Sequence, residues 1–167
     1  MTDTSNTAYA NAGTSAPRVV VGVDGSAVGN DALRWAYAEA VLRNVPLHLV
    51  HCWDYPYYGT MDMVGLDDKI REATMVSAQA LVDGLVARLR SEHSELEQPG
   101  GISVTSEVLQ GAAGRTLLKY ATDSDLLVVG SRGHGGFTGL LLGSVSHTVA
   151  THAEIPVVIV HHKKPND

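Results

Sequence analysis

Short apolar runs alternate with longer segments of helical periodicity along most of the chain. The runs are bounded by glycine, proline or aspartate, as buried strands are, and they lie at 18–23, 47–52, 102–109, 125–129 and 155–160. Between them, apolar residues recur at intervals of three and four, which predicts helices at 27–43, 66–90, 111–123 and 144–153. Strands that alternate with helices favour right-handed crossovers. We therefore expect an α/β fold: a five-stranded parallel doubly wound sheet, order 3-2-1-4-5, with helices on both faces.

Polar residues mark where the domain and its first helix begin and end. Ser26 is a candidate N-cap for that helix, and Asn44 followed by Pro46 should end it. The segment 1–16 is polar and has no periodicity, so we expect a flexible N-terminal tail. A single domain is expected over 17–162, followed by a C-terminal tail at 163–167.

Composition and charge exclude several classes of function. The net charge is −6 and no stripe of lysine or arginine is present, which argues against nucleic acid as a partner. Cys52 is the only cysteine, so no intramolecular disulfide can form. The N-terminus lacks the pattern of a signal peptide and no apolar run is long enough to span a bilayer. We expect a soluble, cytoplasmic protein without a membrane partner.

A glycine-rich segment, GSRGHGGFTGLLLGS, follows the fourth predicted strand from Gly130 to Ser144. In the expected strand order, the first and fourth strands are neighbours at the point where the order reverses, and doubly wound folds bind ligands there. Asp24-Gly25-Ser26 leaves the first strand, and Gly130-Ser131-Arg132-Gly133 leaves the fourth. We expect the two turns to face one crevice.

The glycine-rich segment has the features of a phosphate-binding loop. Glycine permits positive φ and lets a ligand approach successive N–H groups, which suits Gly130 and Gly133. The next helix should begin near Gly143-Ser144, where unpaired N–H groups and the helix dipole favour an anion. Arg132 and His134 add positive charge. A flexible connector is the alternative, but the position between a buried strand and a helix favours binding.

Other glycine-rich motifs do not match this segment. No Gly-Lys-Ser/Thr closes a Walker loop, and Thr138 stands where a dinucleotide fingerprint starting at Gly133 needs its third glycine. A Gly-x-Ser-x-Gly nucleophile elbow is also lacking. We expect Leu140-Leu141-Leu142 to pack against the far side of the loop and fix its geometry.

The segment resembles the motif of the ATP-binding members of the universal stress protein family, which is Gly-x-x-Gly, nine residues, then Gly-Ser or Gly-Thr. Gly130 and Gly133 begin the motif, nine residues follow from His134 to Leu142, and Gly143-Ser144 completes it. The similarity extends from Arg18 to about His161 and includes Val-Gly-Val-Asp-Gly-Ser, Asp-Leu-Leu-Val-Val-Gly and Ile-Pro-Val-Val-Ile-Val.

The resemblance implies an ATP-binding stress-response or regulatory protein that acts as a nucleotide-dependent dimeric switch. It places Asp24 near the ribose, Gly130 and Gly133 near ribose and phosphates, and the main chain of Cys52 at the adenine. The phosphate-binding turn corresponds to Gly143, Ser144 and Val145. The expected cofactor is ATP, with or without Mg²⁺; ADP and a cyclic nucleotide stay open. The full candidate site is Asp24, Gly25, Ser26, Cys52, Gly130, Ser131, Arg132, Gly133, Gly143, Ser144 and Val145.

The family resemblance also implies a homodimer through the last strand, Val157 to Val160. Pairing would protect an apolar edge that would otherwise favour aggregation. A slow Mg²⁺-dependent ATPase or an autophosphorylating enzyme is the alternative function. Phosphoryl transfer needs placed carboxylates and a group that orients the nucleophile, and only Asp24 is well situated. We assign no catalytic residue. A scaffold that has lost its ligand is a third hypothesis, which the retained glycines disfavour.

Several other residues suggest chemistry, but each has a simpler structural interpretation. His48 and His51 should lie on opposite faces of one strand, and His147 and His152 should diverge on a helix, so no metal site is expected. Cys52 is more typical of a small buried hydrophobe than of a redox centre. The aromatic residues after the second strand form either a lid over the adenine or a surface that packs on the neighbouring subunit: Trp53, Tyr55, Tyr57 and Tyr58. We interpret the methionines Met61, Met63 and Met75 as packing residues.

Overall fold

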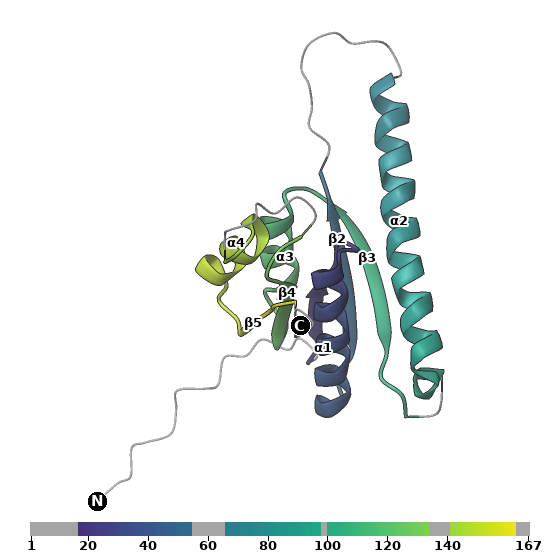
Figure 1. Cartoon of the computed structure of the whole chain (residues 1–167), viewed down its shortest axis with the longest axis vertical. Helices are drawn as coiled ribbons and strands as arrows, with labels where there is room; N and C mark the ends of the chain where they lie inside the picture. The colour runs from purple at the N-terminus through teal and green to yellow at the C-terminus, as the bar shows by residue number, and fades with distance from the viewer. Residues whose placement is uncertain (1–16, 55–65, 98–99, 134–140, 163–167) are drawn as a thin grey trace, which may run out of the picture.

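The chain folds around one parallel sheet, and the computed structural model describes residues 17–54, 66–97, 100–133 and 141–162. Five strands lie in the order β3-β2-β1-β4-β5, which confirms the predicted fold and strand order (Figure 1). Their bounds are β1 Val19–Gly22, β2 Leu47–Trp53, β3 Val104–Gln110, β4 Leu126–Gly130 and β5 Val157–Val160. All strand pairs are parallel; Val19 on β1, for example, lies beside Leu47 on β2 and Leu126 on β4.

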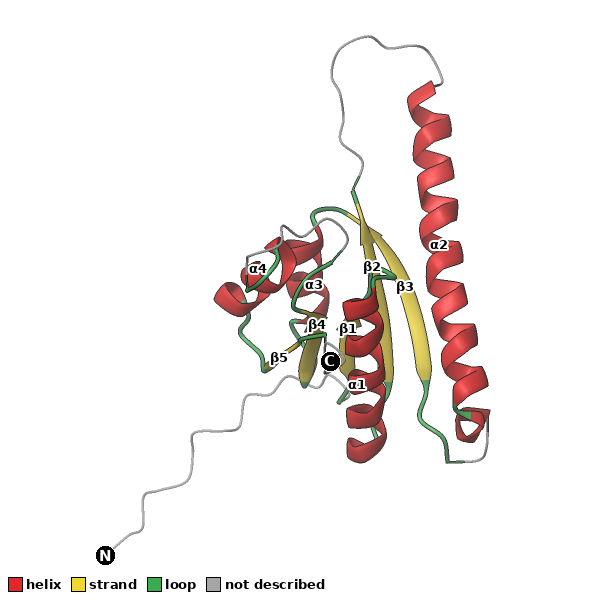
Figure 2. Cartoon of the chain, viewed as in Figure 1, coloured by secondary structure: helices red, strands yellow, loops and turns green. Residues whose placement is uncertain are grey.

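Helices cover both faces of the sheet, as predicted (Figure 2). α1 (Ala27–Arg43) and α2 (Leu66–Glu92) pack on one face, and α3 (Ala113–Ala121) and α4 (Ser144–His152) pack on the other. A short 3-10 helix, η1 (Ser94–Glu97), follows α2. The alternation of elements therefore follows the hydrophobic pattern, with small shifts at the element ends.

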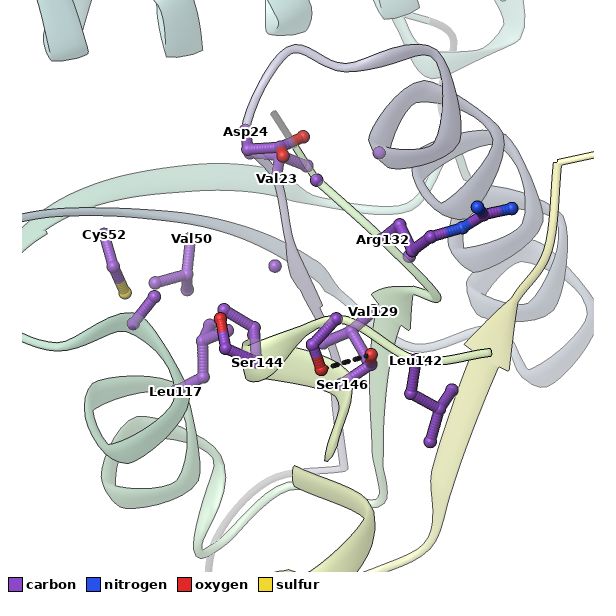
Figure 3. Close-up of a pocket in the computed structure, with 17 residues that line it drawn as sticks. Val23, Asp24, Val50, Cys52, Leu117, Val129, Arg132, Leu142, Ser144 and Ser146 are labelled. Carbon is purple, nitrogen blue, oxygen red and sulfur yellow. Dashed lines mark hydrogen bonds between the residues drawn. The ribbon is translucent and has the colours of Figure 1, made fainter. Parts of the chain in front are cut away.

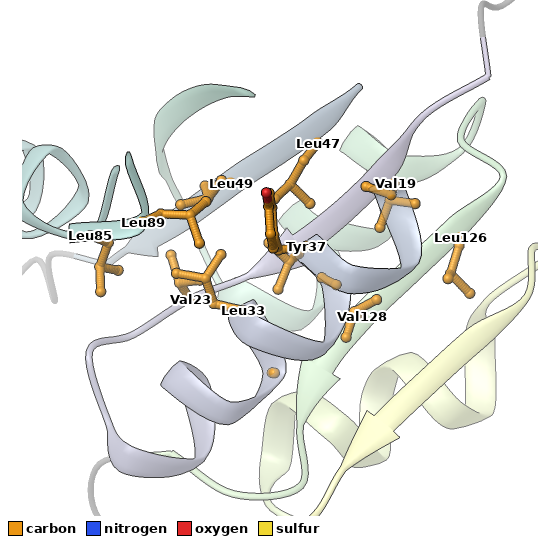
Figure 4. Packing of buried hydrophobic residues seen from close by; sticks show 14 residues of the cluster. Val19, Val23, Leu33, Tyr37, Leu47, Leu49, Leu85, Leu89, Leu126 and Val128 are labelled. Carbon is orange, nitrogen blue, oxygen red and sulfur yellow. The ribbon is translucent and has the colours of Figure 1, made fainter. Parts of the chain in front are cut away.

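Two apolar layers form the core, one on each side of the sheet. Alternate residues of β1 belong to different layers: Val19 and Val21 pack against α1 and α2, whereas Val20 packs against α3 and α4. Figure 4 shows the first layer, where Leu33 and Tyr37 of α1 lie against the sheet. All three valines are fully buried, because β1 is covered on both faces.

The predicted boundaries of α1 are confirmed by its capping contacts. The Ser26 hydroxyl accepts a hydrogen bond from the Gly29 N–H at 3.0 Å, as an N-cap does. At the other end, Asn44 adopts the left-handed conformation, with φ 55° and ψ 49°, and its N–H reaches the carbonyl groups of Ala40 and Val41. Asparagine tolerates this conformation better than most residues, which explains why the helix ends there.

α2 corrects one part of the sequence interpretation. Leu85 and Leu89 are buried as its periodicity predicts, but Ile70, Met75 and Val76 are 44%, 50% and 59% exposed. The packing role expected for Met75 is therefore wrong, and the helical spacing of Ile70 and Val76 does not bury them. Figure 1 shows that the first turns of α2 extend beyond the end of β2. None of the helices in the described ranges is long and apolar enough to cross a bilayer.

β5 is an edge strand whose outer side carries backbone hydrogen-bonding groups. The carbonyl groups of Pro156 and Val160 accept from the N–H groups of Leu127 and Ser131 on the β4 side. Since successive residues of a strand alternate in direction, the N–H and C=O groups of Val157 and Ile159 point toward the open edge. The four side chains of β5 are half-buried.

Candidate functional site

A cavity of about 500 Å³ opens at the carboxyl ends of β1, β2 and β4, where the strand order reverses. This volume lies within the usual range of small-molecule sites. Most of the residues assigned from the sequence line it: Asp24, Cys52, Gly130, Arg132, Gly133, Gly143, Ser144 and Val145. It is lined in addition by Gly22, Val23, Gly29, Val50, Ala113, Leu117, Val129, Leu142 and Ser146. The turns after β1 and β4 thus face one crevice, as expected.

Gly25, Ser26 and Ser131 belong to the turns but do not line the cavity. Gly25 has φ 81°, a conformation that a side chain would strain, so it shapes the turn after β1. The N–H and the hydroxyl of Ser26 both donate to Asp24 Oδ1, at 3.0 and 2.6 Å. Within the described structure, Ser26 therefore contacts the carboxylate of Asp24 instead of the cavity.

Gly130 and Gly133 are required for space, and the expectation that they adopt positive φ is wrong. Neither residue lies in the left-handed region. A Cβ on Gly130 would lie 3.1 Å from Val28 Cγ1, at the start of α1. A Cβ on Gly133 would meet Asp24 Oδ2. The motif glycines thus let the loop after β4 pack closely against the turn after β1.

Hydrogen bonds close the base of the glycine-rich loop. Ser131 is buried; its N–H donates to the Val160 carbonyl at 2.7 Å, and its carbonyl accepts from the Gly143 N–H at 2.7 Å. The Ser146 hydroxyl donates to the same Ser131 carbonyl at 2.7 Å. It also lies 3.1 Å from the Gly143 carbonyl (Figure 3). Sequence reasoning missed Ser146, although a serine in the first turn of a helix is a recognisable capping signal.

The N-terminus of α4 forms the polar part of the cavity. Gly143 is its N-cap, and Ser144, Val145 and Ser146 form the first turn. The N–H groups of a first turn have no carbonyl partner within the helix, and the helix dipole makes this end positive. Arg132 lines the cavity but is exposed, and Figure 3 shows its guanidinium directed away from Asp24.

The opposite part of the cavity is apolar. Val50, Cys52, Leu117 and Val129 contribute side chains from two strands and α3 (Figure 3). Burial raises the pKa of the Cys52 thiol to about 11, so the side chain is neutral at physiological pH. This environment suits the interpretation of Cys52 as a small hydrophobe. The other three carry no sequence signal that separates them from ordinary core residues.

The leucines before α4 differ from expectation. Leu141 is 79% exposed, so its predicted packing against the loop is wrong; the residue precedes the helix on the outer surface. Leu142 lines the cavity instead. Leu140, His134 and Thr138 lie outside the described residues.

The two histidines of β2, His48 and His51, have different hydrogen-bonding partners. His48 Nδ1 lies 3.2 Å from the Tyr120 hydroxyl, and His51 Nδ1 lies 2.7 Å from the Val23 carbonyl, so the two rings are on opposite faces as predicted. Burial, and secondarily Arg18, lowers the pKa of His48. Among the described residues, no group of His, Cys, Asp or Glu side chains could hold a metal.

Trp53 is buried at the end of β2 and does not line the cavity, so it packs within its own chain and neither expectation describes this residue. The other lid candidates, Tyr55, Tyr57 and Tyr58, lie outside the described residues, as do Met61 and Met63.

Strand order, cavity and glycine-rich turn together define a doubly wound α/β protein with a cavity at its switch point. Residues 16–161 match the Universal stress protein family. The chain belongs to this family.

Curated relatives and solved structures agree with this assignment. Universal stress protein Rv2623 of Mycobacterium tuberculosis is 36% identical over 151 residues, which are 90% of this chain and 50% of that protein. The chain thus spans about half the length of the curated relatives that it matches. UspA from Lactobacillus plantarum shares the fold, with TM-score 0.68, 21% identity, and coverage of 86% of this chain and 97% of that one. A universal stress protein solved in complex with cAMP gives TM-score 0.54 and 26% identity, covering 87% and 97%.

Proposed function

We propose that the chain binds an adenine nucleotide, ATP, in the cavity between Asp24 and the N-terminus of α4. The observation that carries this proposal is the arrangement of three environments in one cavity of about 500 Å³. The apolar surface of Val50 and Leu117 suits a purine, and the Asp24 carboxylate can accept hydrogen bonds from ribose hydroxyl groups. The first turn of α4 suits phosphate. The cAMP complex of a relative supports an adenine nucleotide.

The residues proposed to contact the nucleotide follow from this arrangement. Gly143, Ser144 and Val145 would bind phosphate through backbone N–H groups, and Gly130 and Gly133 would let it approach. The main chain at Cys52 would lie beside the adenine. Gly25, Ser26 and Ser131 would shape the site without lining it, and Arg132 would add positive charge at its rim.

Equilibrium titration with ATP, monitored by calorimetry, tests the proposal. Gly133→Ala should weaken binding by about tenfold or more, because its Cβ would displace the Asp24 carboxylate. Gly84→Ala is the matched control, since a Cβ at Gly84 on α2 meets nothing within 4 Å. Absence of ATP binding by the unmodified chain at about 1 mM would refute the proposal. To distinguish binding from slow hydrolysis, the release of inorganic phosphate from ATP in the presence of Mg²⁺ is measured for the unmodified chain and for Asp24→Ala.

The second part of the proposal is a homodimer through β5 that responds to the nucleotide. The outward N–H and C=O groups of Val157 and Ile159 offer an edge for antiparallel pairing across a two-fold axis. The loop that begins at Ser131 connects this strand with the cavity, because the Ser131 N–H donates to the Val160 carbonyl. A nucleotide that shifts Ser131 would therefore also act on the edge strand.

Proline substitution tests the β5 interface. Val157→Pro removes an N–H that points to the open edge, so it should shift the chain toward monomer while the β4–β5 ladder remains. Val158→Pro, one residue further, should instead remove a ladder group and lower stability. Sedimentation equilibrium with and without ATP measures the association. A dimer that persists unchanged in Val157→Pro would place the interface elsewhere.

A further inference from the structure

The carboxylate of Asp24 is enclosed between two glycines from distant parts of the chain. A Cβ on Gly29, in the first turn of α1, would meet Asp24 Oδ1. A Cβ on Gly133, in the loop after β4, would meet Asp24 Oδ2. Each carboxylate oxygen thus occupies the space that a side chain would take at one of these positions. Gly133 belongs to the glycine motif, but Gly29 was not assigned any role from the sequence.

A short chain of hydrogen bonds fixes the same carboxylate from the α1 side. The Gly29 N–H donates to Ser26 Oγ at 3.0 Å, and the Ser26 hydroxyl donates to Asp24 Oδ1 at 2.6 Å. The Ser26 N–H also donates to Oδ1, at 3.0 Å. Oδ1 therefore receives two hydrogen bonds within the turn, and the second oxygen lies on the Gly133 side. Figure 3 shows the Asp24 side chain at the rim of the cavity.

We propose that Gly29 and Ser26 are positioning residues that hold Asp24 in the orientation needed to recognise a hydroxyl-bearing sugar, and so set the preference for ribose over deoxyribose nucleotides. This inference rests on the proposed nucleotide site. An ionised carboxylate only accepts hydrogen bonds, so the ligand must supply donors. In ATP, the ribose hydroxyl groups are donors that a carboxylate can receive. A rotated carboxylate would lose these hydrogen bonds but leave the phosphate and purine contacts in place.

Ser26 has a second role, as N-cap of α1, and the test must separate the two. Loss of a cap lowers stability and would weaken the binding of all nucleotides alike. Loss of carboxylate orientation would change the ratio of affinities for ATP and its deoxy analogues. The ratio is therefore the informative quantity, because a purely structural defect leaves it unchanged.

The experiment compares dissociation constants for ATP, 2′-deoxyATP and 3′-deoxyATP. The unmodified chain should bind ATP about tenfold or more tightly than at least one deoxy analogue, as expected for a hydrogen bond to a charged group. Gly29→Ala and Ser26→Ala should reduce that ratio toward one. Ser26→Thr, which keeps the hydroxyl, should restore it, and Gly84→Ala should leave it unchanged because its Cβ meets open space.

The possible outcomes distinguish this inference from the proposed function. If the unmodified chain binds none of the nucleotides, the proposed function fails. If it binds ATP and both deoxy analogues equally, or if folded Gly29→Ala and Ser26→Ala keep the full ratio, the positioning role is refuted while nucleotide binding stands. Alanine favours a helix over glycine, so Gly29→Ala retains α1, and circular dichroism verifies the fold of each variant. Weaker binding of all three nucleotides with an unchanged ratio would also overturn the positioning role.

Discussion

Cys52 allows the apolar part of the cavity to be tested by chemical modification. Alkylating reagents react with the thiolate, and burial raises the pKa of this thiol from 9.0 to about 11. A shift of two pKa units lowers the thiolate fraction at neutral pH by about 100-fold. We therefore expect native Cys52 to react with iodoacetamide about 100-fold more slowly than the same cysteine in the denatured chain at pH 7.5.

Mass spectrometry at a series of pH values measures this difference. Because Cys52 is the only cysteine, each modified molecule reports one site. The native rate should rise about tenfold per pH unit and should level off only near pH 11. Unfolding returns the thiol to its ordinary pKa. The stability that comes from the retained proton is therefore complete below about pH 9 and is lost as the pH rises toward 11.

Two results would contradict the reasoning. Equal rates for native and denatured chain at pH 7.5 would show that the thiol is in free contact with water. A slow rate that does not change with pH would show that access of the reagent, and not the pKa, limits the reaction. Saturating ATP should slow the native reaction further, because Cys52 lines the proposed nucleotide cavity.

Two further predictions concern stability, measured by urea denaturation. A Cβ on Gly114 of α3 would lie 2.8 Å from Thr148 Cβ on α4, so Gly114→Ala should lower the free energy of unfolding by about 1 kcal/mol or more. A Cβ on Gly84 of α2 meets open space, so Gly84→Ala should raise the free energy of unfolding by up to about 1 kcal/mol. If both substitutions raised it, the close contact of α3 and α4 would be refuted. Asn44 has φ 55°, a conformation that glycine adopts freely and valine does not. Asn44→Val should therefore lower the free energy of unfolding by about 1 kcal/mol or more, and Asn44→Gly should leave it nearly unchanged. Equal effects of the two substitutions would contradict the assigned helix end.

The hydrophobic pattern was sufficient to predict the fold because each buried strand of this chain is short and bounded by residues that break it. β1 is an example: Val19, Val20 and Val21 are all buried, and Asp24-Gly25 follows. The hydrophobic pattern failed on α2, where apolar residues with helical spacing are not covered by another element. Ile70 and Val76 have helical spacing on α2 but are 44% and 59% exposed, and sequence periodicity does not tell which apolar residues of a helix another element covers.

The polar half of the site was predictable and the apolar half was not. Asp24, Gly133 and Ser144 stand in turns whose composition is unusual, so the sequence signals them. Val50 and Leu117 have the same side chains as dozens of core residues in any α/β protein, and only the three-dimensional structure shows that they reach the cavity. Ser26 lies in the turn after β1, where the sequence places it, yet its contact with Asp24 Oδ1 depends on side-chain geometry that spacing does not specify.

Gly133 provides the last prediction, because the reason for a glycine at this position differs from the one that its motif suggests. Its φ is not positive, and its Cβ would meet the Asp24 carboxylate. If space for Asp24 is what requires glycine here, the cost of Gly133→Ala should depend on Asp24. We expect Gly133→Ala to lower the free energy of unfolding by about 1–3 kcal/mol in the natural chain and by much less when combined with Asp24→Ala. Urea denaturation of the four chains in this double-mutant cycle measures the coupling. An equal cost in both backgrounds would show that the loop requires glycine for its own conformation, and the interaction between the two turns would then have no part in it.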